Sequence, residues 1–495
     1  MMEQLLLASP MAIIVIGAFV LLLISHAKRF NLDRLNLIAV FFLILSSVIQ
    51  FVVFKSNSIE FLFSDIFGET FILDTFSRIF DLMFTIGAIL TLLINNDYFK
   101  SRRYFNGEYF ALILFSVFGM MMLSHAHELV TAFIALEIAS LSIYALVGYH
   151  KNNRVSSEAM LKYMVLGSMT GAFFMLGTAL IYGAVGATNL SAIALYTANH
   201  NIDDMALLMV GASFISITIM FKIGAVPFHS WVIDVYHGAP YPITMFMAST
   251  FKIAIFAIAL RLYIVDFGEV NIFWSELLQA ITILTLIGGS WMAIAQRLIK
   301  RMLAGSSIVH SGYLLIGISS LGLGSEMAGP AVMFYLIAYF ISSVGSFGIL
   351  SFIASQSKTQ MRFEDFKGFA NRRPYMALMM SIFMLSLAGF PSTIGFLGKF
   401  YIFTSAIESG QILLAGLGIL TAFISVYYYF KLIAMMYFYE SNEQKKKLPI
   451  DISTILIFFM GLVVIWGGIG TSLIPFIPGA DEFIDIAQET IKSLK

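Results

Sequence analysis

Apolar stretches follow one another along the chain, with short polar segments between them. About 20 apolar residues in a row are enough to cross the hydrocarbon core of a bilayer as one helix. Long uninterrupted runs, without the short alternating strands of a membrane barrel, predict an all-α polytopic membrane protein. We expect about fourteen transmembrane helices, near residues 7–26, 35–54, 72–96, 108–124, 127–149, 157–183, 205–236, 240–263, 273–296, 300–323, 331–355, 373–408, 411–439 and 452–474.

Composition supports lipid as the solvent and argues against a redox centre. Of the 495 residues, 59% are hydrophobic and 12% are charged, about half the charged fraction of ordinary soluble domains. There is no cysteine, which excludes disulfides and thiolate-bound iron–sulfur clusters. No glycine-rich nucleotide loop and no metal-ligand spacing is present. We therefore expect no cofactor in this chain and place any redox chemistry in another subunit.

Charged loops predict the orientation in the membrane. The formal net charge is +0, yet most basic residues lie in every second loop, for example Lys100, Arg102 and Arg301. The opposite loops carry mainly acids, such as Asp203 and Asp204. The positive-inside rule then places the basic loops in the cytoplasm and both termini on the outer side. The N-terminus MMEQLLLASP has no basic region, so no cleaved signal peptide is expected.

Several charged residues fall inside the predicted spans. A charged side chain at the centre of a span costs about 2.5–3.5 kcal/mol. We expect Arg78, Arg261 and Lys431 to lie near helix ends and to reach the interface with their long side chains. The others lie deeper in their spans: Glu137, Lys162, Lys222, Lys252 and Lys399.

A buried ion pair could account for Glu137 and one lysine, but not for four lysines and a single carboxylate. About three positive charges would remain unpaired at low dielectric, so some amines are expected to be neutral part of the time. A lysine that changes its charge can carry a proton. The set therefore indicates a proton path.

Two prolines interrupt apolar stretches at mid-membrane. Pro227 follows Gly224 within FKIGAVPFHSW, and Pro391 follows Gly389 within LAGFPSTIGFLGKF. Each proline removes a backbone N–H group and frees a carbonyl. Broken helices are tolerated where they line a hydrated cavity. We expect the seventh helix, 205–236, and the twelfth, 373–408, to be discontinuous.

These breaks belong to an internal repeat. AMLKY opens the sixth helix and AVMFY opens the eleventh, and a polar segment and a broken helix follow each. Five helices separate matching elements, so the two halves, helices 4–8 and 9–13, must be inverted repeats, as in many transporters. The predicted parts are three N-terminal helices in 1–104, the repeats in 105–265 and 270–440, and a C-terminal helix and tail in 448–495.

Longer motifs resemble a known family. They are ALEIASLSIYALVGY, SSEAMLKYMVLGS, FKIGAVPFHSWVIDVYHGAPYPITMFMASTFKIA, IKRMLAGSSIVHSGYLLIG and LAGFPSTIGFLGKFYIF. Together they resemble the antiporter-like membrane subunits of proton-pumping NADH–quinone oxidoreductase, complex I. VGYHKNN and DVYHGAPYPIT favour one paralogous branch of that family. One departure is His237, where the family often has glutamate.

The resemblance implies a role for each deep charge. Glu137 and Lys162 match the pair that modulates the helix-7 lysine, which is Lys222. Lys252 matches the central helix-8 lysine, and Lys399 the helix-12 residue from which the proton leaves. Two histidines match family positions near the broken helix and on helix 10, either as relay groups or as structural residues: His229 and His310. We take His125, His127 and Glu128 as boundary residues.

The implied function is proton translocation across a bacterial inner membrane, coupled to quinone reduction in other subunits. The implied partners are the lipid bilayer and the neighbouring antiporter-like and small membrane subunits, with no nucleic acid. Three alternatives remain open at this point. They are a subunit of a multi-subunit Na⁺/H⁺ antiporter, a scaffold that does not pump, and an independent transporter of an organic solute.

Overall fold

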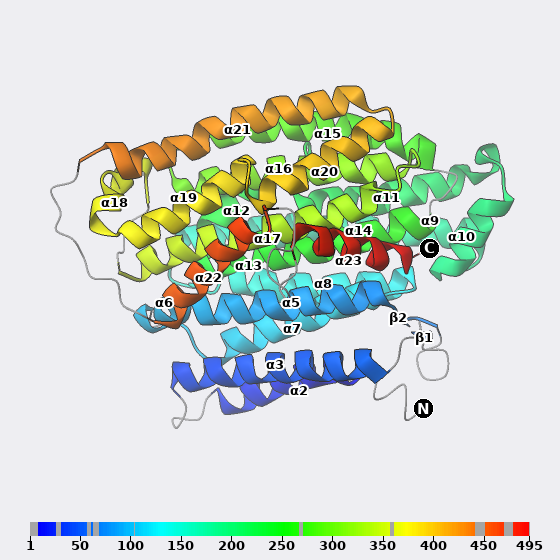
Figure 1. Cartoon of the computed structure of the whole chain (residues 1–495). Helices are drawn as coiled ribbons and strands as arrows, with labels where there is room; N and C mark the ends of the chain where they lie inside the picture. Colours follow the sequence, from blue (N-terminus) through cyan, green and yellow to red (C-terminus); the bar gives the residue numbers. More distant parts are fainter. Residues whose placement is uncertain are drawn as a thin grey trace. The chain divides into compact units, whose positions relative to one another are not determined.

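The computed structural model describes residues 8–25, 31–56, 61–62, 69–102, 104–266, 271–356, 361–440, 451–469 and 479–494. Its residues form two compact units. Unit 1 comprises 1–223, 238–273 and 489–495, and unit 2 comprises 224–237 and 274–488. Figure 1 shows that both units are built almost entirely from helices.

In unit 1, long helices lie side by side, with α2 packed on α3 and α7, α7 on α8, and α9 on α8 and α11 (Figure 1). A two-residue antiparallel ladder joins β1 to β2, with Phe61 opposite Leu73. The elements are α2 Ser9–Ile24, α3 Leu32–Ser56, β1 Phe61–Leu62, β2 Ile72–Leu73, α5 Thr75–Ile94, α6 Asn96–Ser101, α7 Gly107–His125, α8 Leu129–Val147, α9 Arg154–Val185, α10 Leu190–Asn199, η1 Ile202–Met205, α11 Ala206–Ile223, α13 Tyr241–Phe246, η2 Met247–Phe251, α14 Lys252–Arg261 and η3 Leu262–Asp266.

In unit 2, α17 is the central helix and packs against α16, α19, α20 and α22. The helix α21 covers α16, α19 and α20. The elements with most of their residues in this unit are α12 Val232–Gly238, α15 Asn271–Ile294, α16 Ile299–Leu321, α17 Ala328–Gln356, η4 Phe363–Phe366, α18 Phe369–Arg372, α19 Pro374–Ala388, α20 Ile394–Glu408, α21 Ile412–Phe438, α22 Ile452–Trp466 and α23 Ala480–Lys492.

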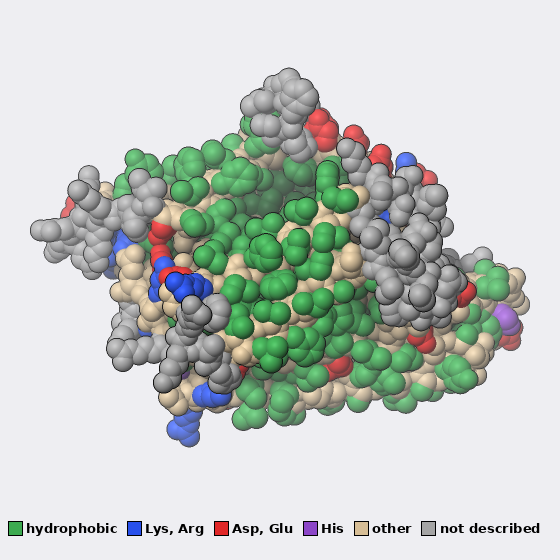
Figure 2. Space-filling model, turned by 90° about the horizontal axis from the view of Figure 1, so that it is seen from below, with side chains coloured by type: hydrophobic (Ala, Val, Ile, Leu, Met, Phe, Trp, Pro, Cys, Tyr) green, Lys and Arg blue, Asp and Glu red, His purple; other side chains and the backbone are tan. Residues whose placement is uncertain are grey.

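The helices have the length and the surface of membrane spans. Among the described residues, eleven helical stretches are long and apolar enough to cross a bilayer, and α2, α19 and α22 are shorter apolar helices. Large apolar side chains point outward, such as Leu23 on α2 and Phe41 on α3. Figure 2 shows hydrophobic side chains over much of the face that it views. The predicted all-α polytopic class is confirmed, whereas the count of fourteen spans and the two inverted repeats remain predictions.

Both predicted helix breaks are present. The helix α11 ends at Ile223 and α12 begins at Val232, with Gly224 between them at φ +76°. The helix α19 ends at Ala388 and α20 begins at Ile394, with Gly389 at φ +84°. Glycine suits both positions because L-residues with a side chain rarely adopt a left-handed backbone. Pro227 and Pro391 follow these glycines, and their missing N–H groups keep the helices from continuing.

The expectation that Arg78 and Arg261 reach the membrane interface is wrong. Their exposed fractions are only 6% and 3%. Arg261, at the end of α14, forms a two-bond ion pair with Asp74, at 2.9 and 3.2 Å. Burial raises the pKa of the Asp74 carboxyl, but the charge of Arg261 and hydrogen bonds from Arg261 and Ser77 together hold it below its usual value. A buried counter-ion therefore takes the place of solvent at this helix end.

We expect Asp74→Asn to lower the free energy of unfolding by about 3–5 kcal/mol, because it leaves the buried Arg261 charge without its partner. In the wild type, this stabilisation is present above the ordinary carboxyl pKa and is lost as the pH falls through the lowered pKa of Asp74. The measurement is denaturant unfolding of the purified protein in detergent at several pH values.

The matched control is Asp33→Asn. Asp33 pairs with Lys100 at 3.0 Å, but the two side chains are 41% and 47% exposed. Exposed pairs contribute about 0–1 kcal/mol. Equal losses in the two variants would contradict the structural role assigned to the Asp74–Arg261 pair.

Candidate functional site

Lys222 lies in the last turn of α11, directly before the first break, with 3% of its surface exposed. Its Nζ donates to Ser140 Oγ at 2.7 Å and to Tyr144 OH at 2.9 Å, both on α8. The amine also lies 5.3 Å from the ring centre of Tyr144 and 6.0 Å from that of Tyr163 on α9. Two hydroxyls and two aromatic rings therefore surround the nitrogen.

This surrounding suits both protonation states of the amine. An ammonium group donates to the hydroxyl oxygens and is attracted to the ring faces. A neutral amine can accept a hydrogen from either hydroxyl, because Ser and Tyr both donate and accept. Lys222 can thus gain or lose a proton without leaving a buried polar group unsatisfied.

Glu137 lies one turn before Ser140 on α8. Its side chain is partly buried, and its Oε1 atom has no hydrogen-bond partner among the described residues. The carboxylate packs on the backbone of Gly171 in α9, where a Cβ atom would come within 2.9 Å of Oε1. A larger residue at 171 would therefore require the carboxylate to move from its present position.

The structure does not bring Lys162 to Glu137. Lys162 pairs instead with Glu158, one turn earlier on α9, at 2.8 Å, and both side chains are substantially exposed. Gly171, against which Glu137 packs, is nine residues beyond Lys162, or about 13 Å along the helix axis. A lysine side chain cannot cover that distance, so this arrangement holds the two apart.

Lys252 is buried, with an exposed fraction of 4%. It is the first residue of α14 and follows η2, a π-helical turn, without a break in the helix. Such turns insert one extra residue into a helix and recur at functional sites. The turn therefore decides which way the Lys252 side chain points.

Lys399 occupies the second break and is buried in unit 2. Its Nζ donates to the carbonyl oxygens of Leu387 and Ala388, each at 2.9 Å, which belong to the last turn of α19. These carbonyls lack partners within the helix and carry the negative end of its dipole. The ring centre of Tyr313 lies 4.9 Å from the same nitrogen.

His310 on α16 forms a second hydroxyl cluster in unit 2. Its Nδ1 lies 2.6 Å from Tyr335 OH, and its Nε2 lies 3.0 Å from Tyr429 OH. Its ring also meets the edge of the Tyr313 ring at 5.7 Å between centres. Tyr313 therefore touches both His310 and Lys399, and joins the two predicted site residues of this unit.

His229 stands apart from that cluster. It lies in the break between α11 and α12 and is partly exposed. Neither the tyrosines around His310 nor the carbonyls around Lys399 contact it through a hydrogen bond. A relay role for His229 remains a prediction.

Sequence reasoning missed Lys300, which stands at the start of the predicted span 300–323 and was not among the candidate residues. It is the second residue of α16, is 5% exposed, and donates to the carbonyl oxygen of His237 at 3.3 Å. It also missed a charge inside the third predicted span, Asp81, which is 2% exposed. The signal for Asp81 was its spacing, because it falls on the same helical face as Asp74 and Arg78.

No group of three or more His, Asp or Glu side chains is placed to hold a metal ion in the part of the chain that the structure describes. The expectation of no cofactor in this chain stays an expectation.

Comparisons with known proteins agree on one family. The transmembrane model of the NADH:quinone oxidoreductase/Mrp antiporter family matches residues 126–425. NADH-quinone oxidoreductase subunit N of Trichlorobacter lovleyi is 39% identical over 378 residues, which cover 76% of this chain and 77% of that protein. Subunit N of Methylovorus glucosotrophus is 34% identical over 445 residues, 90% of each chain.

Solved structures share the fold. A chain of respiratory complex I from Thermus thermophilus with bound aureothin superposes with a TM-score of 0.77 at 27% identity, over 93% of this chain and 96% of that one. A chain of the Mrp complex from Dietzia sp. DQ12-45-1b gives a TM-score of 0.83 at 19% identity, over 100% and 98% of the chains. The second likeness shows the fold alone.

The second break gives a test of how Lys399 is held. A Cβ atom at Gly389 would lie 2.9 Å from Lys399 Cδ and 3.2 Å from its Nζ, at φ +84°. We expect Gly389→Ala to lower the free energy of unfolding by about 1–3 kcal/mol for backbone strain, with a further loss because Lys399 is displaced. The measurement is denaturant unfolding in detergent.

Gly410→Ala is the control for that variant. Gly410 has a similar φ of +77°, but nothing lies within 4 Å of its Cβ position. Gly389→Ala should therefore be the less stable of the two. Equal stability would show that Lys399 does not need the space at Gly389.

Proposed function

This chain belongs to the NADH:quinone oxidoreductase/Mrp antiporter family of membrane proteins, and from that premise we propose that it is subunit N of a proton-pumping NADH–quinone oxidoreductase. In this role it translocates protons across the membrane. The energy comes from quinone reduction in other subunits, and the chain itself supplies a proton path and no redox centre.

The observation that carries the proposal is the site of Lys222. Its amine is buried where no water is needed to satisfy it, between two hydroxyls that serve both protonation states. A structural lysine would be held by a carboxylate. No carboxylate pairs with Lys222 among the described residues, which supports a group that is loaded and unloaded.

We assign Glu137 the task of setting the field at Lys222. It shares a face of α8 with Ser140 and Tyr144, the two partners of Lys222, at spacings of three and seven residues. An anion at Glu137 stabilises the ammonium form of Lys222, and neutralising that anion favours release. Lys162 can affect the charge of Glu137 only after it leaves Glu158. A part for Lys162 in this step therefore requires that it change its ion-pair partner.

The proton then passes to Lys252 and, in unit 2, to the group of Lys399, Tyr313 and His310. The Tyr313 ring contacts both Lys399 and His310, which supports treating the three as one group within that unit. Transfer toward Lys399 ends at the carbonyls of α19, where a cation is favoured. We place the basic loops in the cytoplasm and both termini outside, in a bacterial inner membrane.

The partners we propose are the neighbouring membrane subunits of that complex, because coupling to quinone reduction has to arrive through a protein interface. Nothing observed favours the sodium antiporter, since the Mrp chain resembles this one in fold at low identity. The buried lysines also argue against a scaffold without transport, because charged groups in a membrane interior are costly unless they function.

We expect Lys222→Ala to lower quinone-coupled proton pumping about 100-fold or more, the loss typical when a positioned proton-transfer group is removed. Glu137→Ala should have a similar effect, because the field that loads Lys222 is lost. The measurement is dye-reported acidification of inverted membrane vesicles fed with NADH, normalised to the amount of assembled complex.

The control is Lys100→Ala, which removes one lysine from an exposed pair with Asp33 and should pump as the wild type does. Near-normal pumping by assembled Lys222→Ala or Glu137→Ala complexes would refute the proposed path. A requirement for Na⁺ in the wild type would favour the antiporter instead.

A further inference from the structure

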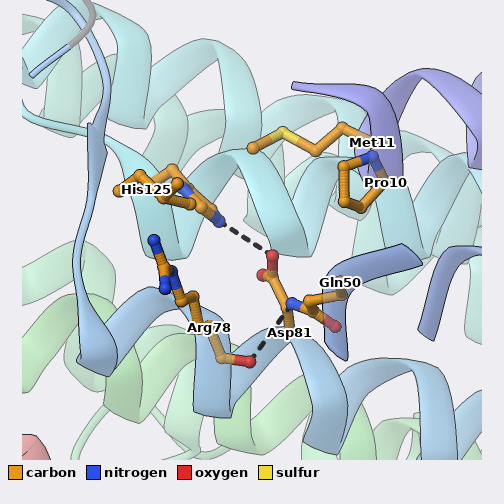
Figure 3. A pocket seen from close by; sticks show the side chains of 7 residues that line it. Pro10, Met11, Gln50, Arg78, Asp81 and His125 are labelled. Atoms are coloured by element: carbon orange, nitrogen blue, oxygen red, sulfur yellow. Dashed lines mark hydrogen bonds and ion pairs between the residues drawn. The ribbon is translucent and has the colours of Figure 1, made fainter. Parts of the chain in front are cut away.

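A second buried titratable pair lies in unit 1, outside the path described above. Asp81, on α5, and His125, the last residue of α7, are 2% and 1% exposed. Asp81 Oδ2 and His125 Nε2 are 2.8 Å apart. The other carboxylate oxygen accepts from Ser124 Oγ at 2.9 Å. Figure 3 shows the two side chains pointing toward each other across a small cavity.

The hydrogen bonds of His125 fix how many protons the pair holds. Nδ1 lies 2.9 Å from the carbonyl oxygen of Ile72, and because a carbonyl only accepts, Nδ1 carries a hydrogen. The contact between Nε2 and Asp81 then needs a second hydrogen. It is either on Nε2 of an imidazolium or on the Asp81 carboxyl. The pair therefore holds one shared proton in the observed geometry.

The surrounding charges allow that proton to leave. Asp74, the N-cap residue of α5, and Arg261 on α14 neutralise each other, and Arg78 on α5 lines the same cavity as the pair. The cluster of Asp74, Arg261, Arg78 and the protonated pair carries one positive charge, and it becomes neutral when the proton leaves. Loss of the proton is thus compensated by the fixed Arg78 cation.

Among the described residues, the cavity beside the pair is lined by no charged side chain other than Arg78. The helices α2 and α3 contribute Pro10, Met11 and Gln50 to the cavity, none of which titrates. His127 interacts electrostatically with Arg261, Asp74 and Glu69 instead. The balance of charge at the pair is therefore set by Arg78, Asp74 and Arg261.

The cavity offers an acceptor for the proton. It has a volume of about 10 Å³ and is lined by Arg78, Asp81, His125 and Gln50 together with apolar residues (Figure 3). A cavity of this size has room for about one water molecule, and although its wall is mostly apolar, Arg78, Asp81 and His125 give that water polar groups to bond.

The pair also lies at an informative place along the chain. His125 ends α7, and the loop with Lys100 and Arg102 precedes the start of that helix. By the positive-inside rule, the pair is on the side opposite the cytoplasm.

Arg261 donates to the Ser124 carbonyl at 2.8 Å and is nine residues beyond Lys252, about 13 Å along the helix axis. The pair therefore lies outward of Lys252 within the same unit.

We propose that Asp81 and His125 form a proton-binding site at the outer end of unit 1, a side branch of the path, which accepts a proton from the direction of Lys252 and releases it to the outer side. The inference rests on the proposed function. On release, the Nε2–H bond of the imidazolium breaks and the proton joins the cavity water as hydronium. A neutral imidazole with a hydrogen on Nδ1 and the Asp81 carboxylate remain.

Asp81→Asn tests the site with little structural change. Asparagine donates from its amide to a neutral His125 Nε2 and accepts from Ser124 Oγ, so every hydrogen bond is kept while the shared proton is removed. The second variant, Asp81→Glu, keeps the acid but adds a methylene. Thr91→Ala is the control, because Thr91 is a buried residue of the same helix whose hydroxyl donates to the Gly87 carbonyl at 2.8 Å, away from the pair. Assembly of the complex, NADH oxidation and proton pumping are measured for each, beside Lys222→Ala.

We expect the Asp81→Asn complex to assemble and to pump fewer protons per NADH than the wild type but more than Lys222→Ala, whereas Asp81→Glu retains a larger share than Asp81→Asn and Thr91→Ala pumps as the wild type does. A pair with a structural role gives the reverse order, because asparagine fits the space better than glutamate. Normal pumping by Asp81→Asn overturns the inference, and so does its failure to assemble. If Lys222→Ala pumps normally, the proposed function fails, whatever the result at Asp81.

Discussion

Hydrocarbon cannot hydrogen-bond, so every polar group inside this protein has to find its partner within the protein. This constraint explains why helices dominate both units and why each break contains glycine, proline and a buried lysine nearby. The last carbonyl groups of α19 have no water to bond. Lys399 Nζ donates to two of them, those of Leu387 and Ala388, in place of water. The same requirement pairs Asp74 with Arg261 at the end of α14.

Two lysines satisfy the constraint in different ways, and the difference has a chemical consequence. Lys222 faces hydroxyls, which donate as well as accept, so the neutral amine is as well satisfied as the ammonium. Lys399 faces carbonyls at a helix C-terminus, which only accept and which attract a cation. The surroundings of Lys222 are suited to a group that changes its charge. Those of Lys399 are suited to a group that holds a positive charge.

Much of this was readable from sequence. Gly224 with Pro227 and Gly389 with Pro391 predicted both breaks, because their effect on the backbone is local. The ion-pair partners of the charged side chains could not be predicted, because they depend on which helices pack together. Lys162 was expected near Glu137 and pairs with Glu158, and Arg78 and Arg261 were expected at the interface and are buried. Asp74, Arg78 and Asp81 share one face of α5, and that spacing was the signal for a buried network.

The surroundings of Glu137 indicate how the charge at Lys222 can be changed. Oε1 has no partner among the described residues and packs on Gly171, while Lys162 is held by Glu158 at a distance along α9. A partly buried carboxyl oxygen without a hydrogen-bond partner costs free energy, so Glu137 is free to gain a partner when the neighbouring helix changes. A cation brought to Glu137 would offset the field of its carboxylate at Lys222, which contacts Ser140 and Tyr144 on the same face of α8 as Glu137. Movement of one lysine between two glutamates would thus be enough to change the charge that Lys222 prefers.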